Sequence, residues 1–497
     1  MGFTFIGRVM VARIYGGTES TEYGIFSLAF VILNFCAALA TLGFEFGIPR
    51  TIAYSRGRGD IDRAHRVIPV AILAGTVSSL IVALSLFSLS GTIATQIFGE
   101  SQLALPLKIL AAGLAFFVIT KVICAIFQGF DNIVARAYFH DILRSVLFPI
   151  LLIPWLFTEP STIGVYYAYL ASLVLPCIGL ILYVKKRDSH ELTRHLLPTK
   201  RIDQGAAKEL LTFSLPLLLS ATLQMIIGWS DSLVIGMIRS ADEVGLYNAA
   251  YPAALFIFLP AAAVGGIYVP IASKLYGERN MPQLQENCRL MSKWIFWLSA
   301  PIILVILLWP KTVLSIFGPI YAENSATALR ILSIGFILSN LTGIASGTLI
   351  AIGLPRFILM TNLVAAVINI TLNFLLIPKM GINGAAIVST VSFTVISILR
   401  AWKIRAVTGS LPFGPKLARS GIATGAAAFL AFVAFGSNYD LSLWSVPLVT
   451  LSLYGLTFVA AIITRSIEPA DTALVRATTL RIGLYSRRLD RILSKLT

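Results

Sequence analysis

Charged side chains are scarce in this chain. Only 12% of its 497 residues are Asp, Glu, Lys or Arg, whereas a soluble globular protein carries about 25%. Apolar residues make up 57%, and the mean hydropathy is +0.85. This composition excludes a water-soluble fold, because too little polar surface is present to cover one. We therefore expect an all-α protein that crosses a membrane many times.

Cysteine and histidine are also rare. The four cysteines show neither metal nor redox spacing, and the four histidines have no i, i+4 pairing, so the sequence predicts no metal site and no cofactor. A membrane-bound polymerase or glycosyltransferase would need paired catalytic carboxylates and a large outer loop. The sequence shows no such pair of carboxylates and no long loop between predicted spans on the outer side, so we expect no enzymatic activity.

Long apolar runs are what the chain has in abundance, and most are of the length that crosses a bilayer. We predict about 14 transmembrane helices. The predicted spans are residues 2–15, 25–43, 67–89, 103–128, 137–158, 162–184, 210–236, 244–270, 291–309, 327–350, 356–377, 382–402, 417–435 and 443–464. The first is about 21 Å of helix, which is short of a full crossing.

The chain repeats itself in its two halves. Four landmarks recur in the same order, about 220 residues later. Residues 22–26 (EYGIF) return as 243–247 (EVGLY), 97–99 (IFG) as 316–318, 107–110 (LKIL) as 329–332 (LRIL), and 151–154 (LLIP) as 375–378. Because each half has six spans, both halves enter the membrane in the same direction. The repeats are therefore parallel, and such duplication is typical of transporters.

This repeat predicts the domain organisation. We expect an N-lobe of helices 1–6 and a C-lobe of helices 7–12 around a central cavity, followed by two further helices. The predicted boundaries are 1–184 for the N-lobe, 185–209 for a basic cytoplasmic linker, 210–403 for the C-lobe, 404–464 for helices 13 and 14, and 465–497 for a basic tail.

Basic residues gather in alternate loops, and this bias predicts the orientation. The loop after the second span, the linker and the loop before the thirteenth span are rich in Lys and Arg, whereas the intervening loops carry almost none. The basic loops belong in the cytoplasm, which places both termini there. We interpret the net charge of +16 and the basic tail as contact with anionic lipid headgroups rather than with nucleic acid.

Cations inside predicted spans are candidates for binding an anion. A charge at a helix centre costs about 2.5–3.5 kcal/mol on insertion scales, so a charge that is kept there usually faces a cavity. Arg8 and Arg13 lie in the first span and Lys121 in the fourth. Each of the three side chains has an alternative role, because it could snorkel to the headgroup region.

Two acids are candidates for ion coupling. Asp231 lies deep in the seventh predicted span, where a carboxylate could bind a proton or sodium, or could instead hold helices together through neighbouring hydroxyls. Glu45 lies near the end of the second span, where an interfacial role is the alternative. Asn362, Asn369 and Asn373 share one helical face and could bind sugar hydroxyls or bond between helices.

Two segments carry a resemblance to a known family. Residues 362–386 (NLVAAVINITLNFLLIPKMGINGAA) closely resemble the helix 11–12 signature of Wzx-type polysaccharide flippases, members of the multidrug/oligosaccharidyl-lipid/polysaccharide exporter superfamily. Residues 13–16 (RIYG) and 22–26 (EYGIF) resemble the opening motif of that family. The chain is also similar to lipid II flippases around residues 12–16, but Tyr251 stands where those proteins place a cavity arginine.

The resemblance implies a function. It implies alternating-access flipping of an isoprenoid-diphosphate-linked oligosaccharide across the cytoplasmic membrane, with Arg13 in the matching motif binding the diphosphate. We expect a monomer that works beside the enzymes of glycan assembly. The alternative is a cation-coupled multidrug exporter of the same superfamily, which would predict a cavity dominated by acids and aromatic residues.

Overall fold

The fold is that of a computed structural model. It describes residues 2–15, 20–158, 161–187, 204–414, 417, 419, 421, 424–426, 443–464, 467–469, 471, 472 and 476. Within these residues every regular element is a helix. Eleven helical stretches there are long and apolar enough to cross a membrane, which confirms the prediction of an all-α, multi-pass membrane protein.

The helices of the first half correspond to the first six predicted spans. They are α1 (Gly2–Ile14), α2 (Thr21–Ala40), α3 (Phe44–Gly57), α4 (Ile61–Thr92), α5 (Ala104–Gly129), α6 (Ile133–Ala135), α7 (Arg144–Phe157) and α8 (Thr162–Arg187). Short π-helical or 3₁₀ stretches lie at Ile93–Ile97, Ser101–Leu103 and Arg136–Leu143. The predicted span at 137–158 thus combines the last of these stretches with α7.

The second half contains the two longest helices of the described residues, α10 (Gln204–Ile238) and α18 (Pro355–Thr408). The others are α11 (Ala241–Ala254), α12 (Leu259–Gly277), α13 (Met281–Leu308), α14 (Pro310–Leu314), α15 (Pro319–Asn324), α16 (Ala326–Leu341), α17 (Ala345–Ala351) and α20 (Val446–Ile463). Most of the predicted span at 417–435 lies outside the described residues. Helix α10 begins at Gln204, inside the range 185–209 that was predicted for the linker.

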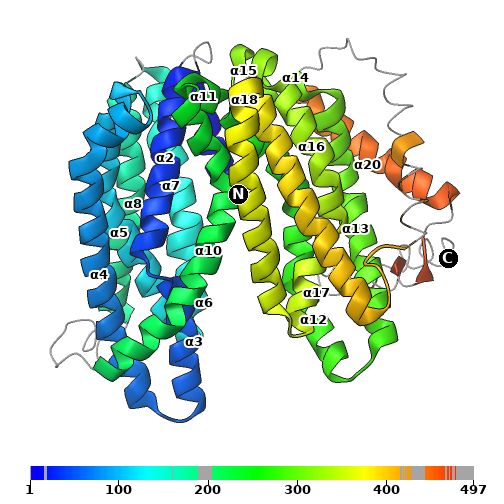
Figure 1. The fold of residues 1–497 in the computed structure, drawn as a ribbon, viewed down its shortest axis with the longest axis horizontal. Helices are drawn as coiled ribbons and strands as arrows, with labels where there is room; N and C mark the ends of the chain where they lie inside the picture. Colours follow the sequence, from blue (N-terminus) through cyan, green and yellow to red (C-terminus); the bar gives the residue numbers. More distant parts are fainter. Residues whose placement is uncertain are drawn as a thin grey trace. The chain divides into compact units, whose positions relative to one another are not determined.

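Helix α18 holds two predicted spans in one element. Gly381 has φ 54° and ψ −135°, which is non-helical, and it separates two arms of the helix (Figure 1). Asn362 on the first arm accepts a hydrogen bond from Arg400 on the second, so the arms lie side by side. The element is therefore a helical hairpin, as the separate predictions for 356–377 and 382–402 require.

The predicted end of the second span at residue 43 coincides with a break between α2 and α3. The chain turns sharply there and continues as α3, because Leu42 and Gly43 adopt φ values of 52° and 74°. Neither value fits a right-handed helix, so the helix breaks without ending the apolar segment. A second helical axis after the break carries Glu45 in its first turn.

The chain divides into two compact units. Unit 1 comprises Met1–Ala249, Phe317–Tyr321 and Ile370–Ala385, and unit 2 comprises Ala250–Ile316, Ala322–Asn369 and Ala386–Thr497. Helix α10 belongs to unit 1, where it packs along α2, α3 and α4. The units are thus defined by packing, whereas the predicted lobes follow the sequence repeat, and the lobe boundaries stay a prediction.

Within unit 1 the two copies of the repeated motif pack against each other. A Cβ atom added to Gly24 would lie 1.7 Å from the Ala241 carbonyl oxygen, and one added to Gly245 would lie 2.2 Å from the Ser20 carbonyl oxygen. The Ser20 hydroxyl also donates to the Asp242 carboxylate. The glycines of EYGIF and EVGLY therefore allow two backbones to touch at equivalent positions of the repeat.

Aromatic side chains surround this glycine contact. The Tyr23 ring lies 5.7 Å from that of Tyr321 and 6.0 Å from that of Phe317, and the Phe5 ring lies 5.4 Å from that of Phe317. Tyr23 also donates a hydrogen bond to the Asn248 carbonyl oxygen. These rings pack around Tyr23, which precedes Gly24 in the motif.

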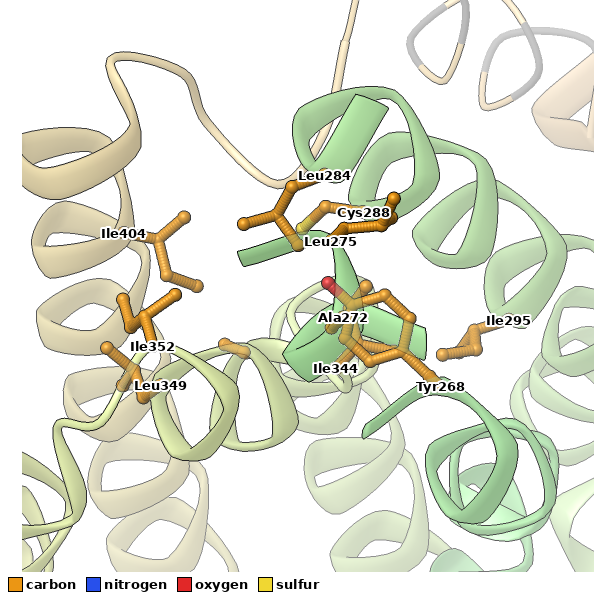
Figure 2. Close-up of a cluster of buried hydrophobic side chains, with 11 residues drawn as sticks. Tyr268, Ala272, Leu275, Leu284, Cys288, Ile295, Ile344, Leu349, Ile352 and Ile404 are labelled. Atoms are coloured by element: carbon orange, nitrogen blue, oxygen red, sulfur yellow. The ribbon is translucent and has the colours of Figure 1, made fainter. Parts of the chain in front are cut away.

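Unit 2 has its own apolar core (Figure 2). Tyr268 and Ala272 of α12 pack with Cys288 and Ile295 of α13 and with Leu349 of α17. The Tyr268 hydroxyl lies 2.9 Å from that of Thr348, which satisfies the one polar group of that ring. The break between α16 and α17 brings the short α17 onto this core, beside both arms of α18.

Gly24→Val should destabilise the protein, because the new side chain would collide with backbone atoms of Ala241. Unlike a side chain, these atoms cannot move away by changing rotamer. We expect a loss of at least about 1–3 kcal/mol, the range for overpacking a core. Gly91→Val in α4 is the matched control, since a Cβ at Gly91 meets nothing within 4 Å. Thermal unfolding in detergent measures both. Equal melting temperatures for the two variants would contradict the close contact at Gly24.

Candidate functional site

A cavity of about 480 Å³ lies inside unit 1, between α10 and the ends of α2, α3 and α5. Its volume is within the range of about 300–1,000 Å³ that small-molecule sites occupy. The α10 wall is formed by Leu217, Leu218, Ser220, Ala221, Gln224, Met225 and Trp229. The opposite wall is formed by Ala38, Thr41, Gly43, Glu45, Phe46 and Lys121. One wall is thus largely apolar and the other carries charge.

The break between α2 and α3 shapes one end of this cavity. A Cβ at Gly43 would lie 2.2 Å from the Ser214 carbonyl oxygen, and one at Gly47 would lie 1.9 Å from the Ser214 hydroxyl oxygen. Only glycine allows α10 to approach this closely. The same turn directs the first residues of α3 toward α5, where Glu45 meets Lys121.

Glu45 holds two cations at the cavity wall. Its carboxylate lies 3.3 Å from the Lys121 ammonium and 3.0 Å from the Arg136 guanidinium. Arg136 also donates to the Gln128 side chain at 2.9 Å. Side-chain exposure is 22% for Glu45, 17% for Lys121 and 29% for Arg136, so all three are half-buried. The sequence predicted roles for Glu45 and Lys121 separately, and the structure brings them together.

A π-helical stretch positions Arg136. This stretch, Arg136–Leu143, precedes α7 and directs Arg136 and His140 toward the same small space beside Glu45 and Lys121. The wider turn of a π-helix changes which residues share a face, and such stretches recur at functional sites. His140 pairs with the exposed carboxylate of Asp141 at 2.8 Å.

Two further arginines rest on aromatic rings rather than on acids. The Arg8 guanidinium lies 4.7 Å from the Phe30 ring centre and 5.2 Å from that of Trp229, and its residue is 8% exposed. The Arg144 guanidinium lies 4.0 Å from the Phe117 ring centre and donates to the Tyr169 hydroxyl at 2.9 Å. No carboxylate of the described residues pairs with either arginine.

These groups form one continuous band in unit 1, because rings link the cations. The Phe30 ring lies 5.6 Å from that of Trp229 and 5.8 Å from that of Tyr169, and Lys121 lies 5.0 Å from the Phe117 ring. We define the cation–aromatic band by its members: Arg8, Phe30, Glu45, Phe117, Lys121, Arg136, Arg144, Tyr169 and Trp229. Trp229, Glu45 and Lys121 of this band line the cavity.

The band carries an excess of positive charge. Four cations stand against the single carboxylate of Glu45, and aromatic faces stabilise cations without neutralising them. Attraction between charges is stronger at such half-buried positions than in bulk water. The arrangement therefore favours an anionic ligand that can accept several charge-assisted hydrogen bonds, as phosphate oxygens do.

The other candidates from the sequence lie elsewhere. Arg13 is exposed, at the last turn of α1. Asn369 is fully buried, and Asn362 accepts a hydrogen bond from Arg400 in unit 2. Asn373 belongs to unit 1, where its amide donates to the Asp231 carboxylate at 2.7 Å. The asparagine stripe is therefore divided between two polar clusters.

Asp231 is buried, with 1% of its surface exposed. Its carboxylate accepts a hydrogen bond from the Tyr247 hydroxyl at 2.6 Å as well as the bond from Asn373. Tyr247 belongs to the repeated motif EVGLY, and next to it Asn248 donates to the Ser232 hydroxyl at 2.9 Å. These bonds tie α10, α11 and the α18 hairpin together at one acid.

Several residues of the site were missed in the sequence. Arg144 lies within the predicted span at 137–158, where its charge was the available signal, while Arg136 lies just before that span. The rings of Phe117 and Tyr169 gave no signal, because aromatic residues in apolar helices usually belong to the hydrophobic core.

The structure also places Lys293 of α13 in a buried ion pair with Asp471, at 2.6 Å. Asp471 lies in the segment that was predicted to be a basic tail.

The fold and this band define a polytopic α-helical membrane protein with a cationic interior site. The model of the family described as "Polysaccharide biosynthesis protein" matches residues 1–276, more than half of the chain, and a MatE model matches residues 216–375. The chain belongs to the polysaccharide biosynthesis protein family. The resemblance to Wzx-type flippases is thereby confirmed.

Individual relatives agree with this assignment. A putative O-antigen transporter of Shigella flexneri is 22% identical over 80% of this chain and 93% of its own length. The probable flippase AglR of Haloferax volcanii is 22% identical over 86% of each chain. An uncharacterized membrane protein of Methanocaldococcus jannaschii, MJ1068, is 28% identical, but the match spans 41% of this chain and 42% of that protein.

A solved structure shares the fold. The lipid II flippase MurJ in an inward closed conformation superposes with a TM-score of 0.76, covering 93% of this chain and 96% of that chain at 13% identity. At this identity the likeness concerns the fold alone.

Glu45→Gln should lower stability, because it leaves Lys121 and Arg136 half-buried without a counter-charge. We expect a loss of about 1–3 kcal/mol, which Lys121→Met in the same chain should partly restore. Glu278→Gln is the matched control, since it removes the exposed pair with Lys274, where the side chains are 51% and 76% exposed. Thermal unfolding measures each variant. A Glu45 variant as stable as the Glu278 variant would refute the ion pairs at the cavity wall.

Proposed function

We propose that this chain is a flippase that moves a lipid-linked oligosaccharide across the cytoplasmic membrane by alternating access, and that the isoprenoid-diphosphate headgroup binds at the cation–aromatic band. The observation that supports this most directly is the charge of the band: four cations against one carboxylate, beside a 480 Å³ cavity. The names of the Shigella and Haloferax relatives agree with it.

The chemistry of the band suits a diphosphate. Arginine presents a planar fork of N–H groups that matches phosphate oxygens, and lysine adds a compact charge. The guanidinium groups of Arg8 and Arg144 are held in place by rings, so they can keep unused N–H groups for a ligand. The apolar α10 wall beside them suits the start of an isoprenoid chain.

The contrast with a multidrug exporter lies in the sign of the charge. An exporter of cationic drugs needs acids to replace the water around its cargo, whereas Glu45 in the band is already paired with two cations. The geometry of the band therefore supports the flippase over the exporter.

Alternating access would require the motif contact around Gly24 and Gly245 to separate once in each cycle. In the proposed orientation both termini lie in the cytoplasm and this contact lies toward the outer side. The glycine contact and the aromatic rings beside it would then close the outer side while the headgroup enters from the cytoplasm.

Arg13, exposed on α1, is proposed as a further headgroup contact. We also propose that the protein acts as a monomer beside glycan assembly enzymes.

Arg144→Gln should lower the rate of flipping at least tenfold, because the band loses a cation that no acid compensates. Arg144→Lys should retain part of the rate, since it keeps the charge but loses the planar fork. The measurement is translocation of a fluorescent polyprenyl-diphosphate-linked glycan in proteoliposomes. Arg50→Gln is the matched control: its guanidinium also lies on a ring, 3.8 Å from the Phe213 centre, but it is exposed and outside the band. Equal rates for Arg144→Gln and Arg50→Gln would contradict the proposed site.

Asp231 is proposed as the site where an ion gradient is coupled to transport, with Glu45 as a second candidate. An acid that carries charge in one conformation and none in another links ion binding to the balance between states. The bonds from Tyr247 and Asn373 connect Asp231 to α11 and to the α18 hairpin, so a change in its charge would be felt by both.

Asp231→Asn should leave slow downhill exchange that no longer responds to an imposed pH or sodium gradient, because the side chain mimics the neutral acid. Tyr247→Phe is the control, since it removes one hydrogen bond but keeps the carboxylate, and should retain the gradient response. Gradient-driven and gradient-free flipping are compared in the same vesicles. A normal gradient response in Asp231→Asn would make the residue a packing acid.

A further inference from the structure

Among the residues that the structure describes, Arg400 in the second arm of α18 hydrogen-bonds only neutral side chains. Its Nε donates to the Thr361 hydroxyl at 3.2 Å, and its two terminal nitrogens donate to the Ser346 hydroxyl at 2.6 Å and to Oδ1 of Asn362 at 2.7 Å. Ser346 lies on α17, and Thr361 and Asn362 lie on the first arm of α18. We call these four residues the Arg400 cluster, and all of them belong to unit 2.

The helices that form the cluster supply no acid. Residues 324–439 contain no Asp or Glu, so both arms of α18, together with α16 and α17, carry cations only. In the described part of the chain no carboxylate pairs with Arg400. A half-buried charge in a membrane protein costs several kcal/mol unless an opposite charge or a wet cavity compensates it, and bonds to neutral oxygens orient a guanidinium without neutralising it.

Hydrogen-bond donors in the cluster exceed the acceptors. A guanidinium has five N–H groups, and the bonds to Thr361, Ser346 and Asn362 use three of them. The Asn362 amide nitrogen is buried and has no partner among the described residues, and Asn362 as a whole is only 3% exposed. Unused donors beside an uncompensated cation are what a phosphate group requires.

The place of the cluster in α18 suggests a lipid rather than a free ion. Arg400 lies eight residues before the end of α18 at Thr408, about 12 Å along the helix, which is near headgroup depth. Lys403 and Arg405 follow toward the predicted cytoplasmic end. On the first arm, Met360 and Leu363 flank the cluster with 62% and 50% of their surface exposed, and they offer an apolar face for a lipid chain.

We propose that the Arg400 cluster is a second anion site, which binds the phosphate of a membrane lipid in unit 2. The guanidinium and the Asn362 amide would donate to the phosphate oxygens, while the lipid chain lies along the first arm of α18. The site is separate from the cation–aromatic band, all of whose members lie in unit 1. It does not depend on the proposed transport function, because binding of a phosphate can be measured without flipping.

The test measures binding of two lipid phosphates to the full-length protein by native mass spectrometry. The probes are dioctanoyl phosphatidylglycerol, which represents bulk lipid, and farnesyl diphosphate, which represents an isoprenoid carrier. Arg400→Gln should bind at least one probe tenfold or more weakly than the unaltered protein, and Arg400→Lys should fall between them. Arg405→Gln is the matched control, since it removes an exposed cation from the same helix.

Selective loss of phosphatidylglycerol would identify bulk lipid as the ligand, and selective loss of farnesyl diphosphate would identify a carrier. If Arg400→Gln does not fold, Ser346→Ala, which keeps the cation and removes one of its supports, should still weaken binding severalfold. The proposal would be overturned if Arg400→Gln binds both probes as tightly as the unaltered protein. If only Ser346→Ala folds, unchanged binding of both probes by that variant would overturn it. Arg144→Gln in the same assay separates the two sites: it should alter binding at the band and leave the Arg400 cluster intact.

Discussion

The structure of unit 1 depends on how charge is held among apolar helices. Four cations lie along α1, α5, the π-helical stretch and α7, and the described residues supply one carboxylate, Glu45, that pairs with any of them. Rings of Phe30, Phe117 and Trp229 take the place of further acids. Because aromatic faces stabilise a cation but leave its charge in place, the band stays able to attract an anion. A second carboxylate in the band would stabilise these helices, but it would weaken the attraction of the band for an anionic ligand.

Close backbone contact is the second constraint. Gly24 and Gly245 let the two copies of one motif touch, and Gly43 and Gly47 let α10 reach the break between α2 and α3. Apolar side chains gain little from meeting each other in lipid, so helices associate there through close packing and hydrogen bonds. This explains why glycine, rather than a larger apolar residue, stands at the contact between the two copies of the motif.

Much of the fold could be predicted, because the lipid bilayer that surrounds the chain restricts it to apolar transmembrane helices. Runs of apolar residues predict spans, and the structure confirms them over the described residues with boundaries shifted by a few positions. The site was predicted in part: Arg8, Lys121 and Glu45 were identified by the cost of charge in hydrocarbon, and all three lie in the cation–aromatic band. Arg136 was missed because it lies just before the predicted span at 137–158, on a π-helical stretch. Arg144 was missed although its charge inside that span was a signal. Nothing in the sequence distinguished Phe30 or Phe117 from ordinary core.

By itself the sequence determined the solvent, the helical class and the family resemblance, because these follow from composition, from apolar run length and from motifs that are local in the chain. The tertiary structure alone decided which charges meet. Asp231 and Asn373 lie 142 positions apart and share a hydrogen bond, and Lys121 meets Glu45 across 76 positions. Within the described part of the chain, Arg400 bonds to Asn362 and pairs with no acid. The free-energy cost of a charged side chain in lipid can be estimated from its position within an apolar run. Its partner is set by the packing of helices that are distant in the sequence, and the local sequence does not contain that information.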